Sequence, residues 1–65
     1  MADFDEAAAQ AARYNRDRIL AASDWTQVAD APVDVAAWAT YRQALRDVPQ
    51  QAGFPENITW PEMPT

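Results

Sequence analysis

The prolines of this chain are confined to one part of it, and their distribution decides where a long helix can form. Residues 1–22 contain neither proline nor glycine, whereas all five prolines and all three tryptophans lie between Ser23 and the C-terminus. Proline and glycine are the least favourable residues inside a helix, so the first third of the chain can form one and the rest is divided into short segments. Such segments do not fold alone, and we expect the tryptophans to meet in one place as packing and docking groups.

The size and charge of the chain limit what it can bind. Its 65 residues make one small domain at most, which buries only about 60% of the surface exposed by its unfolded form. Without cysteine, neither disulfides nor thiolate-bound zinc can stabilise it, so a partner or homo-oligomer formation would help. The net charge of −5 argues against nucleic acid and against anionic membranes as partners. The acidic start resembles no secretory signal, so we expect a soluble protein of a cytoplasm.

Two helices are predicted from local signals. Asp3 and Glu6 resemble a capping box, and the alanine-rich stretch that follows predicts a helix from there to about Ala22. Residues 24–32 break the helical period and predict a loop that reverses the chain direction. Asp34 occupies an N-cap position, and a second, amphipathic helix is predicted from Val35 to about Asp47, before Pro49.

The remainder of the chain favours extended or polyproline-like backbone, because proline follows both Phe54 and Trp60. The apolar side chains of Phe54, Ile58 and Trp60 would let this segment lie over the groove between two helices. We therefore expect a mainly α fold, a two-helix hairpin with an extended, proline-rich C-terminal segment packed across it.

Little in the sequence points to catalysis or to a bound cofactor. Histidine, cysteine and lysine are absent, and the only serine, Ser23, has no base to activate it. Asp24, Asp30 and Asp34 surround one loop but lack the ligand spacing and glycine of a calcium loop, and the single glycine of the chain excludes a glycine-rich phosphate loop. We expect a non-enzymatic protein without metal or cofactor.

The large apolar residues are therefore interpreted as core and partner-docking groups together. In so thin a core some aromatic area stays exposed, and an exposed apolar patch commonly marks a docking site. The predicted core and docking residues are Ile19, Leu20, Trp25, Trp38, Tyr41, Leu45, Phe54, Ile58 and Trp60.

Two further sets of residues carry predictions. Arg42 and Arg46 lie four positions apart on one helix, where like charges repel unless acids approach them, so we expect Asp24 or Glu56 to pair with one of them. The first helix also has a face of mostly small residues, which is either solvated or lets another helix approach closely. The residues of this candidate arm interface are Phe4, Ala8, Ala11 and Ala12.

Several sequence blocks together resemble one known family. They are DWTQ at residues 24–27, WATYRQALRD at 38–47, GFP at 53–55 and a final Trp60-Pro61 pair. In this combination the chain resembles the tail assembly chaperone domain of tailed bacteriophages, over about Arg13 to Pro61. It departs from that pattern in its alanine-rich start, and at Ser23, where relatives often carry cysteine.

The resemblance implies a role in phage tails. Because the module occurs both as a small separate protein and at the ends of tail-fibre proteins, it implies either a chaperone-like factor of tail or tail-fibre assembly or a structural part of the distal tail. The partner would be a tail or tail-fibre protein, met in the bacterial host cytoplasm during assembly or in the virion tail. Residues 13–65 would form the domain and residues 1–12 a helical arm continuous with its first helix. A small inhibitor of a host protein remains the alternative from a different class.

Overall fold

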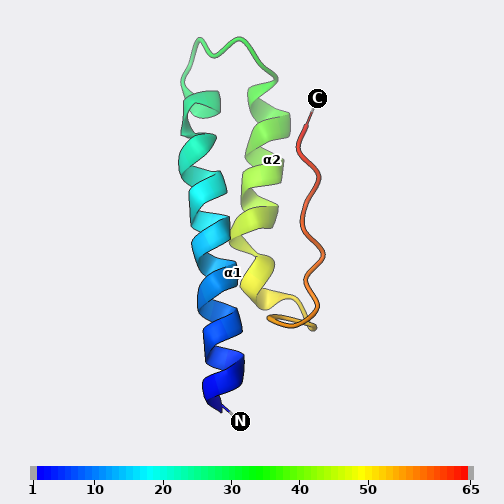
Figure 1. Cartoon of the computed structure of the whole chain (residues 1–65). Coiled ribbons are helices and arrows are strands. Elements are labelled where there is room, and N and C mark those ends of the chain that lie inside the picture. The colour runs from blue at the N-terminus through cyan, green and yellow to red at the C-terminus, as the bar shows by residue number, and fades with distance from the viewer. Residues whose placement is uncertain (1, 65) are drawn as a thin grey trace.

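The computed structural model of the chain describes residues 2–64, with side chains from Glu6 onward. Within that range it contains no β-strand, and its two α-helices, α1 and α2, lie antiparallel as a hairpin (Figure 1). After the second helix the chain turns back and runs beside the hairpin toward the loop that joins the helices (Figure 1). The mainly helical class predicted from the sequence is confirmed. The elements in chain order are α1 (Ala2–Ala22), the 3-10 helix η1 (Asp24–Gln27), α2 (Val35–Arg46) and the 3-10 helix η2 (Val48–Gln50).

Helix α1 gives the molecule its elongated shape. Its 21 residues span about 31 Å at the usual rise of a helix, and its N-terminal turns extend beyond η2 (Figure 1). The radius of gyration is 13.4 Å, against about 10.7 Å for a compact domain of this length. Because α1 begins at Ala2, Asp3 lies inside the helix and does not precede it as predicted. No helix in residues 2–64 has both the length and the apolar character needed to cross a membrane.

Helix α2 begins and ends where local signals predict. The Asp34 carboxylate accepts a hydrogen bond from the backbone N–H of Ala37 at 3.1 Å, which is the N-cap arrangement expected from the sequence. The helix ends at Arg46, and Pro49 lies in the short helix η2 that follows it. The predicted span of the second helix is therefore confirmed to within one residue.

The predicted loop at residues 24–32 is partly wrong, because its first residues form η1. Two hydroxyl groups explain why the chain forms a tight turn at this point. Ser23 Oγ donates to the carbonyl oxygens of Ile19 at 2.9 Å and Leu20 at 3.2 Å, and Thr26 Oγ1 donates to the carbonyl of Ser23 at 2.7 Å. Both residues are buried, Ser23 at 5% and Thr26 at 0% exposed. Their short-range bonds close a tight turn directly after α1, and the chain reverses only beyond it.

The core is small, and its apolar residues come from α1, the second half of α2 and η2. Leu45 and Val48 are fully buried, and Ala12 and Tyr41 are 6% and 8% exposed. Helix α1 contacts both α2 and η2, and each of these three elements contributes at least one of the buried residues. Such a core leaves most large side chains only partly covered.

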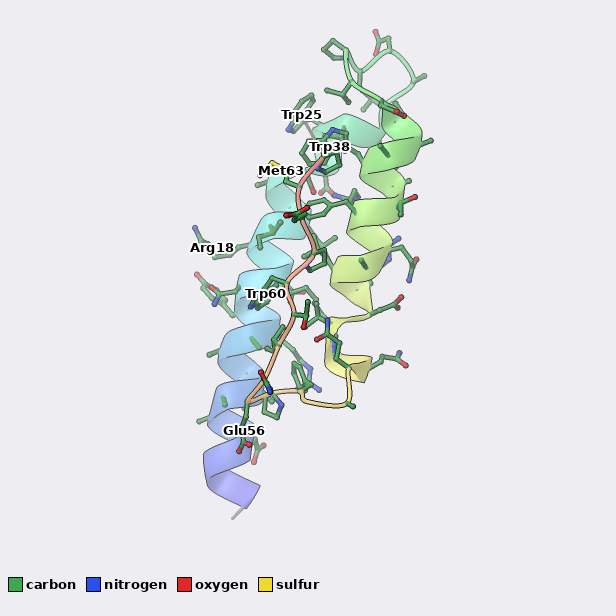
Figure 2. All side chains as sticks on the ribbon, turned by 90° about the vertical axis from the view of Figure 1, so that its right-hand side faces the viewer. Arg18, Trp25, Trp38, Glu56, Trp60 and Met63 are labelled. Atoms are coloured by element: carbon green, nitrogen blue, oxygen red, sulfur yellow. The ribbon has the colours of Figure 1, made fainter. Side chains whose placement is uncertain are left out.

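The C-terminal segment is held by a few polar contacts at its start. Gln51 Nε2 donates to the carbonyl of Thr59 at 2.8 Å, and its Oε1 accepts from the Thr59 N–H at 2.9 Å. Inside the loop so closed, the N–H of Asn57 donates to the Gly53 carbonyl at 2.7 Å. The Arg13 guanidinium lies 5.2 Å from the centre of the Phe54 ring, which joins this loop to α1. Beyond it the segment continues along the face formed by both helices (Figure 2).

Candidate functional site

A row of three aromatic rings runs from the surface into the core. The ring centres of Trp25 and Trp38 are 6.4 Å apart, and those of Trp38 and Tyr41 are 5.5 Å apart with the planes almost perpendicular. An edge-to-face pair such as Trp38 and Tyr41 contributes about 0.5–1.5 kcal/mol beyond the area that it buries. Tyr41 is buried, Trp38 is half-buried and Trp25 is 51% exposed. The buried end of the row fixes the position of the exposed indole.

The predicted core and docking residues divide by burial. Tyr41 and Leu45 lie in the core, and Trp25 and Trp60 are exposed. The others take an intermediate position, in which one side of the residue contacts the fold and the other faces water: Ile19, Leu20, Trp38, Phe54 and Ile58.

The three tryptophans do not form one cluster. Trp25 and Trp38 are paired, whereas Trp60 lies lower on the C-terminal segment, over the α1 side of the face, and is 39% exposed (Figure 2). The physical reason is the path of the segment, which places Trp60 beside the middle of the hairpin and only Met63 toward the end that carries Trp25 (Figure 2). The expectation that all the indoles meet in one place is therefore wrong for Trp60.

Arg42 joins α2 to the end of α1. Its Nη1 donates to the carbonyl of Leu20 and to Ser23 Oγ, both at 2.7 Å, and its Nη2 donates to Asp24 Oδ1 at 2.7 Å. The last carbonyl groups of a helix lack intrahelical partners and carry partial negative charge, which a guanidinium satisfies well. The Arg42 side chain is only 13% exposed, while that of Asp24 is 70% exposed. The structure thus places Asp24 and Arg42 in an ion pair.

The other two residues predicted to pair lie apart from this contact. Arg46 donates from Nη2 to Gln43 Oε1 at 2.9 Å within its own helix. Glu56 is exposed and lies at the far end of the face from Trp25 (Figure 2). Within the described residues the structure pairs neither side chain with an opposite charge.

The candidate arm interface is only partly open to a partner. Ala12 is buried in the core, so it cannot meet the helix of a partner. Ala8 is intermediate and Ala11 is exposed. Phe4 lies in the part of α1 whose side chains fall outside the described residues.

Sequence reasoning missed several residues that shape this face. Met63 and Val28 are 62% and 52% exposed. Met63 lies toward the end of the face that carries Trp25 (Figure 2), and Val28 directly follows η1 in the loop before α2. Gln51 anchors the C-terminal segment through Thr59. Ser23 closes the end of α1 through its hydroxyl group, and a hydroxyl directly after a helix is a known signal for bonds to its last carbonyls. No local signal marks Met63, because its position depends on where the segment docks.

The geometry of the described residues favours binding through an open surface. Residues 2–64 enclose no pocket, and their acidic side chains form no group of three that could hold a metal ion. Large apolar groups instead stand on the face along which the C-terminal segment runs (Figure 2). Partly exposed tryptophan with a buried edge is the side chain that most often anchors a protein partner.

The comparisons with known proteins agree with the predicted resemblance. A family model described as phage tail assembly chaperone protein matches residues 9–65. This match confirms the family indicated by the sequence blocks, and it includes all of α2 and the C-terminal segment. No curated protein and no solved structure matches the chain significantly.

Proposed function

Because the chain belongs to the phage tail assembly chaperone family, we propose that it is a non-enzymatic protein-interaction module that binds a tail or tail-fibre protein during assembly in the host cytoplasm. Membership of the family indicates a role in tail assembly, and the chaperone-like action is our proposal. In that action the chain covers an aggregation-prone apolar surface of its partner until the partner is built into the tail. Residues 13–65 act as the binding domain, and residues 1–12 as a helical arm.

One structural observation supports this proposal above the others. The exposed indole of Trp25 is held by Trp38, which is in turn held by the buried Tyr41. A side chain that is exposed yet fixed loses little conformational entropy when a partner covers it. A rigid aromatic anchor therefore suits reversible protein binding.

The experiment begins with a phage in which the gene for this chain is deleted. We expect infected cells to accumulate incomplete tails, visible by electron microscopy, together with an insoluble tail protein. Supplying the chain from a plasmid should restore both complete tails and the solubility of the tail protein. Normal tails and normal solubility in the deletion phage would refute the proposed function.

Purified virions decide between the chaperone-like factor and the structural component. Quantitative mass spectrometry should find the chain far below the copy number of the tail proteins if it leaves after assembly. Stoichiometric amounts would establish the structural alternative instead. Recovery of a host enzyme and no tail protein with the tagged chain would establish the third alternative, an inhibitor of a host protein.

A further inference from the structure

Apolar exposure and negative charge coincide at one end of this molecule. Trp25, Val28 and Met63 are all more than half exposed, and Figure 2 shows Trp25 and Met63 at the same end of the face. We call this the hairpin-end surface, defined by Trp25, Val28 and Met63 with the acidic residues Asp24, Asp30, Asp34 and Glu62 around them.

The charge around this surface is of one sign. All four of its acidic residues are exposed, and neither residues 24–41 nor residues 57–64 contain an arginine. Arg42, which is bonded to Asp24 of this surface, is only 13% exposed. The exposed Arg18 lies on the α1 side of the face, nearer to Trp60 than to Trp25 (Figure 2). A partner that approaches Trp25 therefore meets a negative potential that no exposed cation of these segments offsets.

We propose that the hairpin-end surface docks a cationic apolar segment, in which an apolar side chain is flanked by arginine or lysine, and that this segment belongs to a tail protein. The inference rests on the proposed function and adds the place and the chemistry of the contact. The apolar side chain covers Trp25 and Met63. A flanking cation lies near Asp30 or Glu62, or over the exposed indole, which attracts cations through its face.

A second copy of the chain fits this surface poorly. Each copy carries a net charge of −5, and two hairpin-end surfaces facing each other would oppose like charges. Juxtaposed like charges oppose association most strongly at low salt. Charge complementarity therefore favours a basic partner segment over self-association.

The test uses the full chain and two probes from the same phage, namely its purified tail proteins and overlapping peptides that span them. Titration calorimetry should find that the bound peptides are those with apolar residues flanked by arginine or lysine. Their affinity should fall by at least about fivefold when salt rises from about 0.05 M to about 0.5 M, because the Debye length shortens from roughly 14 Å to roughly 4 Å.

Matched variants locate the contact. Trp25→Ala should weaken binding by about thirtyfold, as expected for a central aromatic anchor. Because that change also removes the pair with Trp38, a second variant, Asp30→Lys with Glu62→Lys, alters only exposed charges and should weaken binding by about tenfold at low salt. Tyr14→Ala is the control, since Tyr14 is 66% exposed and lies about 200° around α1 from the buried Ala12. It should change affinity less than twofold.

Four outcomes overturn the inference. Tail peptides that bind both variants as tightly as the unchanged chain would place the contact elsewhere. Dimerisation that Trp25→Ala abolishes, without peptide binding, would make a second copy the occupant. If the deletion phage makes incomplete tails and the double lysine variant restores them as fully as the unchanged chain does, the inference fails and the proposed function stands. Normal tails in the deletion phage would refute both the inference and the proposed function.

Discussion

Arg42 bonds three residues at and just after the end of α1. It satisfies the carbonyl of Leu20 and the hydroxyl of Ser23 with one nitrogen and the carboxylate of Asp24 with another. The two bonds to Leu20 and Ser23 are partly buried, whereas the partner Asp24 is largely in water. Most of the stabilisation should therefore come from capping α1 and little from the ion pair, since exposed pairs contribute about 0–1 kcal/mol.

Replacing Arg42 with alanine should lower the free energy of unfolding by about 2–3 kcal/mol, because hydrogen bonds to a charged group contribute about 1.5–3 kcal/mol and the carbonyl of Leu20 is left without its cation. Urea denaturation followed by far-UV circular dichroism measures the change. Arg46→Ala is the matched control on the same helix, since Arg46 bonds only Gln43 at the surface, and it should cost less than about 0.5 kcal/mol. Equal effects of the two substitutions would contradict the capping role of Arg42.

Gly53 is required by a close approach of the chain to itself. A Cβ atom at this position would lie 2.5 Å from the carbonyl oxygen of Asn57 and 2.8 Å from its Cβ. Gly53→Ala should therefore force the loop open and cost about 1–3 kcal/mol, the usual range for overpacking. The loss of order should appear as altered amide shifts at Thr59 and Gln51 in NMR spectra. Ala52→Ser, at the exposed neighbouring position, should leave those shifts unchanged.

The elements differ in how far the sequence predicts them. α2 is specified by residues within or beside it, namely the Asp34 cap, the amphipathic pattern and Pro49, so its bounds could be predicted. η1 could not, because Asp24–Gln27 has the composition of a loop and becomes helical through the buried hydroxyls of Ser23 and Thr26. Burial is set by the contact between helices, which no local pattern reveals.

Ion pairs between residues of different elements also could not be predicted from the sequence. The sequence allowed four ion pairs, between Asp24 or Glu56 and Arg42 or Arg46. Of these the structure contains the pair of Asp24 and Arg42. The register of α2 against α1 decides this, because it brings Arg42 to the end of α1 and leaves Arg46 pointing along its own helix. The exposure of Trp25 could be anticipated, but only the fold brings Met63 to the same end of the face (Figure 2).

The N-cap of α2 offers a test at the level of a single helix. Asp34→Ala removes the acceptor for the Ala37 N–H and should cost about 1 kcal/mol, while Asp34→Asn, which keeps an oxygen at the cap, should recover most of it. Urea midpoints of the three proteins measure the difference. An alanine variant as stable as the asparagine variant would show that the cap does not stabilise α2.

At the level of the whole molecule, the small core makes stability depend on the C-terminal segment. Only Ala12, Tyr41, Leu45 and Val48 are buried apolar residues among those that the structure describes. The segment adds the half-buried Ile58 and the partly covered Trp60, together with the bonds between Gln51 and Thr59. It runs beside the hairpin (Figure 1), and no backbone hydrogen bond joins it to α1 or α2 within the described range.

Ending the chain at Asn57 should therefore lower the free energy of unfolding by about 2 kcal/mol, since the half-buried Ile58 and the partly covered Trp60 each contribute about 1 kcal/mol. It should also expose the apolar face, so that the truncated chain binds the dye ANS. Removing only residues 63–65 is the matched control, because Met63 is mostly exposed and stability should change little. If truncation at Asn57 altered neither the urea midpoint nor ANS binding, the segment would contribute nothing to the core. Retained stability with strong dye binding would instead show that the hairpin folds alone and that the segment merely shields its apolar face.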